Sequence, residues 1–191
     1  MSVEPAGLDS RVAAADHALV RDARHGDRSA FDALVNRYGP DMYRYATRLL
    51  GSEADAAEAV QEAFVSAWKG IAGFEGRSAV RTWLFRLVHR RAVDLQRRTR
   101  PVPVDDTVIA AYAGRADSDP LQQVMDAELL AALQQALGEI GETQRAVWLL
   151  REVEEMSYAE IAETLSMTHD SVRGVLHRAR AELSERLKTW R

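Results

Sequence analysis

The chain has no cysteine, and its 191 residues include only 11 glycines and 5 prolines. Without cysteine it can form neither a disulfide framework nor a thiolate metal site, which suits a reducing compartment. Sparse glycine and proline, together with few β-branched runs, favour helices over sheets. Because 47% of the residues are apolar, a packed core is available, and we expect an all-α fold.

Targeting and membrane signals are also missing. No basic region followed by an apolar run stands at the N-terminus, so we predict no signal peptide. No stretch approaches the roughly 18 consecutive apolar residues of a membrane span. We therefore expect a cytoplasmic protein with no membrane span of its own.

The sequence offers little for catalysis. Its five histidines, at positions 17, 25, 89, 169 and 177, show no metal-ligand spacing. Neither a phosphate-cradling glycine loop nor a nucleophile–base pairing is recognisable. We therefore expect that the protein is not an enzyme and has no catalytic residues, no metal and no cofactor.

Charge is distributed in blocks. The net charge of −4 alone argues against nucleic-acid binding. However, residues 77–100 contain eight arginines and one acid, residues 101–142 contain eight acids and one arginine, and residues 173–191 contain six bases and two acids. This order predicts two surfaces that face nucleic acid, separated by a segment that does not.

Two short amphipathic helices joined by a tight turn are predicted between Ser157 and Arg180. Apolar residues recur at helical spacing in both helices, and Ser157 and Thr168 stand where N-caps should stand. The outer face of the second helix is polar, basic and small. This is the layout of a helix-turn-helix, whose second helix enters the DNA major groove. An ordinary helical hairpin with a solvated face would show the same local pattern.

The N-terminal half is read as a series of further helices. We expect a disordered end up to Ala15, a helix capped by Asp16, and a second helix that begins at Ser29 and is kinked or split at Gly39-Pro40. The helix that Ser52 opens has an acidic face, on which like charges three and four residues apart cost a few tenths of a kcal/mol each. That face is either simply solvated or a docking surface for a basic partner.

A glycine-punctuated loop over residues 70–78 leads into a helix expected from about Val80 to Arg98. Arginines at offsets of four and seven line one face of this helix, and Phe74 in the loop looks exposed. A solvated arginine face is the plain interpretation. Arginine this dense, beside Trp83 and Phe74, also suits phosphate contacts with stacking on an unpaired base.

Composition divides the chain into domains. Pro, Gly, Ser and Asp dominate residues 101–120, which we read as a flexible acidic linker. The expected organisation is a disordered N-terminus (1–15), a helical domain (16–100), the linker (101–120) and a second helical domain (121–191). In the second domain we expect a helix to Leu137, a helix capped by Thr143, the helix-turn-helix, and a terminal helix reaching Trp190.

Four stretches together carry a family resemblance. They are DAAEAVQEAFVSAW (55–68), RTWLFRLVHRRAVD (81–94), the acidic linker, and QRAVWLLREVEEMSYAEIAETL with SVRGVLHRAR (144–180). In this order and spacing they resemble a bacterial RNA polymerase sigma factor of the small, two-domain extracytoplasmic-function (ECF, group IV) class, over about residues 16–190.

The resemblance implies a protein that binds core RNA polymerase, recognises −10 and −35 promoter elements, helps to open the promoter and directs initiation at a specific gene set. Residues 16–100 would be sigma region 2, which binds core polymerase and the −10 element, and residues 121–191 would be region 4, which binds the −35 element. The implied partners are the β′ clamp helices and β flap of the core enzyme, promoter DNA both duplex and melted, and an anti-sigma factor. The linker would run toward the active and RNA-exit channels.

The resemblance also implies three sets of site residues. Those implied to bind core polymerase are Asp55, Glu58, Gln61, Glu62, Phe64 and Trp68. Those implied to bind the −10 element, with the loop capturing a flipped base, are Phe74, Arg77, Ser78, Arg81, Trp83, Arg86, Arg90, Arg97 and Arg98. Those implied to lie nearest the −35 element are Thr168, His169, Asp170, Ser171, Arg173, Gly174, His177 and Arg178.

The chain departs from the family pattern at a few positions. Ser166 stands in the turn where the family often has glycine, and Val175 replaces a common arginine in the recognition helix. Arg90 replaces a common asparagine, which bears on its single-strand contact. We expect docking to survive these changes and base preference at −35 to differ.

Two other functions fit parts of the sequence. A helix-turn-helix repressor or activator acting without polymerase would explain residues 157–180 but leave the acidic and arginine helices without roles. It predicts specific duplex binding by the pure protein, whereas a sigma factor binds promoters weakly without core enzyme. A helical adaptor that binds only proteins predicts no salt-dependent DNA affinity.

Overall fold

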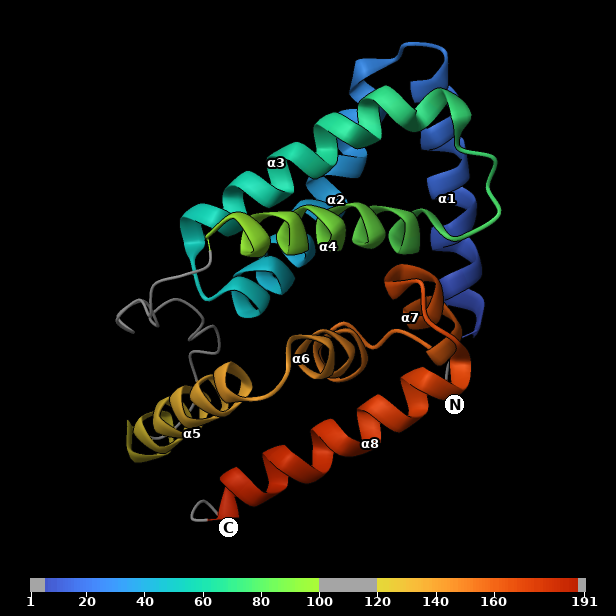
Figure 1. Cartoon of the computed structure of the whole chain (residues 1–191). Helices are drawn as coiled ribbons and strands as arrows, with labels where there is room; N and C mark the ends of the chain where they lie inside the picture. Colours follow the sequence, from blue (N-terminus) through green and yellow to red (C-terminus); the bar gives the residue numbers. More distant parts are fainter. Residues whose placement is uncertain (1–5, 100–119, 189–191) are drawn as a thin grey trace.

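The computed structural model describes residues 6–99 and 120–188, and every regular element there is helical (Figure 1). A first module contains α1 (Ala6–Arg24), α2 (Arg28–Leu50), α3 (Glu53–Gly70), the short 3-10 helix η1 (Ile71–Gly73) and α4 (Val80–Thr99). A second contains α5 (Pro120–Glu139), α6 (Glu142–Trp148), the π turn η2 (Leu149–Val153), α7 (Tyr158–Leu165) and α8 (His169–Arg186). The expected all-α fold with two helical regions is confirmed.

Close packing of α3 against its neighbours organises the first module. Four alanines at helical spacing on α3 are fully buried: Ala56, Ala59, Ala63 and Ala67. Small side chains let helices approach closely, and α3 packs on both α2 and α4. Larger buried residues such as Tyr45, Leu84 and Phe85 fill the interior beside them. The polar side of α3 is thereby turned outward.

Local capping explains where the helices of the second module begin. The hydroxyl of Ser157 accepts a bond from the Glu160 amide, and the Glu160 carboxylate accepts from the Ser157 amide at 2.8 Å. This reciprocal pair satisfies two otherwise unpaired donors. Thr168 caps α8 by accepting from the Ser171 amide at 3.2 Å. Both predicted caps are confirmed, as is Ser52 at the start of α3.

The turn of the helix-turn-helix closes in an unusual backbone conformation. Ser166 ends α7 with φ 54° and ψ 45°, in the left-handed region that glycine occupies most easily. Ser166 therefore adopts the left-handed backbone conformation at the position where the family pattern often has glycine. Buried Val172, Leu176 and Ala179 then hold α8 against the rest of the second module.

Several expectations for the N-terminal helices were wrong. Helix α1 begins at Ala6 rather than near Asp16, because its alanine-rich start has high helix propensity. Asp16 is not a cap: it is 4% exposed and accepts hydrogen bonds from Arg37 and Tyr38 of α2. The cap of α2 is Asp27, which accepts from the Ser29 amide. The split expected as one alternative at Gly39-Pro40 is absent, since α2 continues through Pro40 and buried residues on both sides hold one continuous apolar face.

Two boundaries in the second module also differ from expectation. Thr143 is not a cap, since α6 begins at Glu142 and the Gly141 amide donates to the Gln144 side chain at 3.1 Å. Helix α8 ends at Arg186, and the expected terminus at Trp190 lies outside the described residues. Outside them, too, are residues 1–5 and nearly all of the expected linker.

The two modules touch. Helix α7 packs against α4 (Figure 1), and η2 and α6 contact α2. The helix-turn-helix of the second module therefore lies beside the arginine-rich helix of the first.

Candidate functional site

A stripe of exposed side chains runs along α3. Glu58, Gln61, Val65 and Trp68 are spaced three, four and three residues apart, so they share one helical face. Val65 is 47% exposed and Trp68 is 37% exposed. The Trp68 ring is held edge-on against Phe31, with centroids 5.0 Å apart. We call these four residues the α3 stripe. An acid beside exposed apolar side chains is typical of a protein-docking surface.

The other predicted residues of α3 lie differently. Asp55 is half-buried, and Glu62 forms an ion pair with Arg91 of α4 at 3.4 Å. Phe64 is only 9% exposed and belongs to the core, so it supports the surface without forming part of it. Sequence reasoning missed Val65. Its spacing of four from Gln61 and three from Trp68 was the available signal.

The glycine-punctuated loop is anchored by aromatic packing. Phe74 and Trp83 are each 8% exposed, and their ring centroids lie 4.7 Å apart. The expectation that Phe74 is exposed was therefore wrong, because α4 offers it an aromatic surface on which to bury. Arg77 is exposed and pairs with Glu75, and Ser78 is half-buried.

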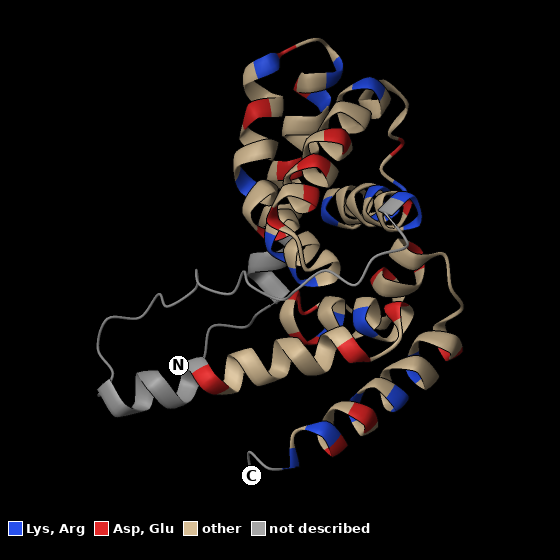
Figure 2. Cartoon of the chain, turned by 60° about the vertical axis from the view of Figure 1, so that its left-hand side comes forward, with Lys and Arg blue, Asp and Glu red and all other residues tan. Residues whose placement is uncertain are grey.

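Helix α4 presents the expected arginines to solvent only in part. Arg86, Arg90, Arg97 and Arg98 are exposed. Arg81 is half-buried, with its guanidinium 5.0 Å above the Phe85 ring. Figure 2 shows basic positions along both α4 and α8. An exposed arginine row can neutralise consecutive phosphates.

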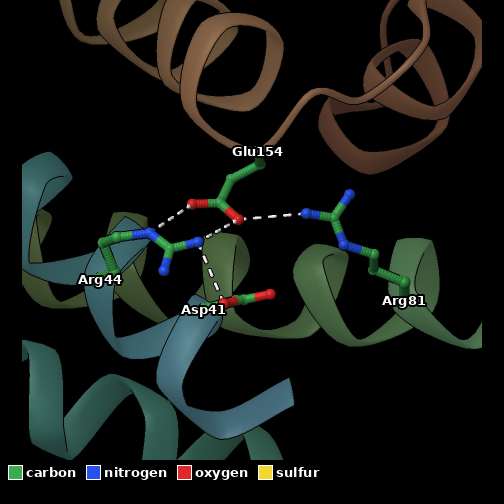
Figure 3. A network of polar contacts seen from close by, with 4 residues as sticks. All are labelled: Asp41, Arg44, Arg81 and Glu154. Atoms are coloured by element: carbon green, nitrogen blue, oxygen red, sulfur yellow. Dashed lines mark hydrogen bonds and ion pairs between the residues drawn. The ribbon is translucent and has the colours of Figure 1, made fainter. Parts of the chain in front are cut away.

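A buried carboxylate joins the two modules. Glu154, which follows η2, has a side chain with no exposed area. Arg44 of α2 donates to both of its oxygens, at 3.2 and 3.1 Å, and Arg81 of α4 donates to Oε2 at 3.1 Å (Figure 3). Arg44 also pairs with Asp41 at 3.0 Å. A charge buried in this way requires partners that neutralise it.

The pKa values in this network show two opposing effects. Burial raises the pKa of Glu154 above its ordinary value, although Arg44 and Arg81 work to lower it. Burial works to lower the pKa of Arg44, but Glu154 and Asp41 raise it overall. The carboxylate thus bears a desolvation cost that its arginine partners only partly offset.

The outer face of α8 matches the expected polar surface. Exposed residues in its first turns and beyond are Thr168, His169, Asp170, Ser171, Arg173, His177 and Arg178, with Gly174 half-buried among them. Arg173 is 66% exposed and stands 4.0 Å from Asp170, one turn earlier. The predicted residues are therefore together on one side of the helix.

A shallow hollow of about 370 Å³ lies between α7 and α8. Its lining residues are Tyr158, Arg173, Leu176, His177, Arg180 and Ala181. Arg180 donates to Glu152 at 2.9 Å, and the Tyr158 ring meets that of His169 with centroids 5.6 Å apart. Tyr158 and Arg180 were not predicted as neighbours of this face.

Within the part of the chain that the structure describes, no three histidine, aspartate or glutamate side chains are grouped so as to hold a metal ion. The helices described there also include none long and apolar enough to cross a membrane.

Comparison with known families agrees with this division into modules. The family described as Sigma-70 region 2 matches residues 34–102, and the family described as Sigma-70, region 4 matches residues 130–183. The first match runs from Leu34 within α2 through α4 with its arginine row, and the second covers the helix-turn-helix.

Similar proteins cover nearly the whole chain. The RNA polymerase sigma factor CnrH of Cupriavidus metallidurans is 32% identical over 177 residues, which cover 89% of this chain and 93% of CnrH. The ECF RNA polymerase sigma-E factor of Escherichia coli is 30% identical, with coverage of 91% and 94%. A structure of CnrH in complex with the cytosolic domain of CnrY has a TM-score of 0.70 at 28% identity, covering 92% and 98% of the two chains. The chain belongs to the ECF sigma factors, which recognise promoters and initiate transcription with RNA polymerase.

Proposed function

We propose that this sigma factor divides its task among three surfaces: the α3 stripe binds core polymerase, the α4 arginine face binds the −10 element, and the outer face of α8 binds the −35 element. Residues 16–100 form region 2 in this proposal, and residues 121–191 form region 4. The observation that carries it is the outward placement of three chemically different faces on separate helices.

The α3 stripe suits the β′ clamp helices of the polymerase. Glu58 supplies a negative charge and Gln61 a neutral hydrogen-bonding group, while Val65 and Trp68 supply exposed apolar area. A large aromatic side chain packed edge-on against Phe31 is held in place before binding. Such rigid aromatic side chains commonly contribute most of the binding free energy at protein interfaces. Asp55 and Glu62 flank the stripe and extend its negative charge.

The α4 face suits promoter DNA near −10. Arg86, Arg90, Arg97 and Arg98 supply phosphate contacts, and Arg77 and Ser78 in the preceding loop lie ready for a melted base. Phe74 and Trp83 keep that loop on α4 by their mutual stacking. These two aromatic side chains therefore position the loop. Either ring could stack on a melted base only if the Phe74–Trp83 contact were broken.

The α8 face suits the major groove at −35. Its first turn carries His169, Asp170 and Ser171, and the next turns carry Arg173, His177 and Arg178. Residues near the start of a recognition helix are the ones that usually reach base edges. The half-buried Gly174 lets the helix approach DNA closely. Region 4 also touches the β flap in this proposal.

An anti-sigma factor is a further proposed partner. CnrH, which is similar over nearly the whole chain, has been solved in complex with the cytosolic domain of CnrY. A regulator of that kind would compete with polymerase for the α3 stripe, because the stripe is the apolar part of the exposed docking face.

Photo-crosslinking tests these assignments. A photoreactive residue at Gln61 should attach to the β′ subunit in the complex with core polymerase, and one at His177 should attach to DNA near −35 in the promoter complex. The same residue at the exposed Asp32 of α2 provides the control and should give neither product. Crosslinks from Gln61 to another subunit, or from His177 to protein alone, would contradict the proposal.

A further inference from the structure

Several polar contacts hold the two modules together. Besides the Glu154 network, Glu163 of α7 lies 3.7 Å from Arg86 of α4. Arg145 of α6 donates to the Leu49 carbonyl at the end of α2, at 2.9 Å. In two of these three contacts a carboxylate of the second module meets an arginine of α4. The second module therefore neutralises part of the surface that we assign to DNA.

The closed arrangement conflicts with promoter binding. The positions −10 and −35 differ by about 25 base pairs. At 3.4 Å per base pair, this spacing corresponds to about 85 Å of duplex. Helix α7 packs directly on α4, and only the turn at Ser166 separates α7 from α8. The two DNA-facing helices cannot serve both elements until α7 leaves α4. Separation of the modules must break the contacts of Glu154.

We propose that Glu154 is an interdomain latch that keeps the free sigma factor closed and withholds Arg81 from DNA. This inference rests on the proposed function, because it adds the half-buried Arg81 to the α4 face that we assign to the −10 element. Glu154 acts through both arginines: Arg44 clamps its two oxygens, and Arg81 adds a third hydrogen bond. The carboxylate mimics a phosphate that accepts from the same guanidinium.

The chemistry of the latch suits reversible opening. In the closed state, the Glu154 carboxylate is stripped of water, which opposes the gain from its arginines. On opening, Glu154 regains water, Arg44 keeps Asp41 as a partner, and Arg81 is freed for a phosphate. The contact therefore has a specific geometry. Its net stabilisation of the closed state is small enough for the binding of polymerase or DNA to overcome.

The test measures the distance between modules in the free protein. The chain has no cysteine, so fluorescent labels can be placed on single cysteines introduced at the exposed positions Asn36 in α2 and Ala181 in α8. Wild type should show high energy transfer. Glu154→Lys places a third cation beside two arginines and should raise the ratio of open to closed molecules by about tenfold or more. Glu154→Gln should have a smaller effect in the same direction.

A matched control variant and a second latch variant show whether an effect of Glu154→Lys is specific to the latch. Glu152→Lys changes charge equally two residues away, but Glu152 pairs with Arg180 inside the second module, so energy transfer should stay at the wild-type value. Arg44→Gln breaks the latch from the first module and should also open the chain. Circular dichroism confirms that each variant is folded. If Glu154→Lys and Arg44→Gln are both folded and both show the same high energy transfer as wild type, the proposal is wrong.

Addition of core polymerase separates this inference from the proposed function. Wild type should lose energy transfer on binding core enzyme, and Glu154→Lys should bind with higher apparent affinity. Opening by Glu154→Lys without any binding to polymerase would support the latch and refute the proposed function. Normal polymerase binding with identical transfer in wild type and the latch variants would refute the latch alone.

Discussion

The rings of Phe74 and Trp83 lie 4.7 Å apart, and each side chain is 8% exposed. The pair fastens the loop between η1 and α4 to the first module. Arg77 and Ser78, two of the residues that we assign to the melted −10 element, follow Phe74 in this loop. Their position therefore depends on an aromatic contact that belongs to the core.

Replacement of Phe74 by alanine should destabilise the first module. Loss of a buried aromatic side chain costs about 3 kcal/mol or more, because its cavity is only partly refilled. The free energy of unfolding, measured with urea, should fall by about that amount. Phe74→Leu, which keeps most of the apolar volume, should lose less. Wild-type stability in Phe74→Ala would mean that the ring is free to contact DNA and that the packing is unimportant.

Reversal of charge on the α3 stripe should impair polymerase binding. Glu58 is exposed and lies one turn from Gln61, so Glu58→Lys presents a cation to the proposed basic partner. We expect the dissociation constant for core enzyme to rise at least about tenfold, or 1.4 kcal/mol. Asp32→Lys on α2 makes the same charge change and should leave affinity unchanged. Equal affinities for the two variants would exclude Glu58 from the interface.

Truncation of Arg173 should weaken −35 recognition. Its side chain is 66% exposed and its interaction with Asp170, at 4.0 Å, is weak, so the guanidinium is available to DNA. Arg173→Ala should cost about 1–3 kcal/mol if it meets a base edge. Promoter affinity of the polymerase complex would be measured on native and substituted −35 sequences. Arg24→Ala, an exposed arginine in α1, is the control. An equal loss on every sequence would assign Arg173 to phosphate instead of bases.

The turn of the helix-turn-helix should become more stable with glycine. Ser166 has φ 54°, a conformation that costs non-glycine residues about 1–2 kcal/mol. Ser166→Gly relieves this strain but increases the entropy of the unfolded chain, so we expect a net gain of about 0.5–1 kcal/mol. Ser166→Ala keeps the strain and should show no gain. The melting temperatures of the two variants test this prediction. If Ser166→Gly melts at or below the temperature at which Ser166→Ala melts, Ser166 is not strained.

His89 should make the first module sensitive to acid. Burial lowers its pKa to about 4, and Tyr45 lies at hydrogen-bond distance, 2.9 Å from Nδ1. The unfolded histidine takes up a proton near pH 6.5, whereas the folded one stays neutral, so stability falls as pH drops from about 6.5 to 4. His89 should account for about 2–3 kcal/mol of this loss.

Urea unfolding at pH 7 and pH 4.5 tests the role of His89. The loss between the two pH values should be smaller in His89→Gln than in wild type. His25→Gln alters an exposed histidine and should retain the wild-type pH dependence. Identical pH dependence in all three proteins would show that His89 titrates normally.

Local signals in the sequence were sufficient to place much of the fold. Ser52, Ser157 and Thr168 cap helices as predicted, because a cap depends on only three or four neighbouring residues. The outer face of α8 also followed from spacing alone. Asp16 was misread because its partners, Arg37 and Tyr38, come from the next helix.

Contacts between distant segments could not be predicted in this way. Phe74 buries on Trp83, and Glu154 meets Arg44 and Arg81 more than seventy residues away in sequence. In the sequence, Glu154 is one acid among several in REVEEM, and periodicity gives no reason to single it out. Its importance comes from burial and from two partners that only the packed modules bring together.

The most direct test is run-off transcription with purified core RNA polymerase on a library of genomic fragments, with and without this protein. We expect new start sites that share two spaced upstream elements, and their loss with Glu58→Lys but not with Asp32→Lys. If an active core enzyme gains no new start sites while the protein alone binds duplex DNA tightly and specifically, the protein acts without polymerase, and the assignments of the α3 stripe to polymerase and of the α4 face to the −10 element are wrong.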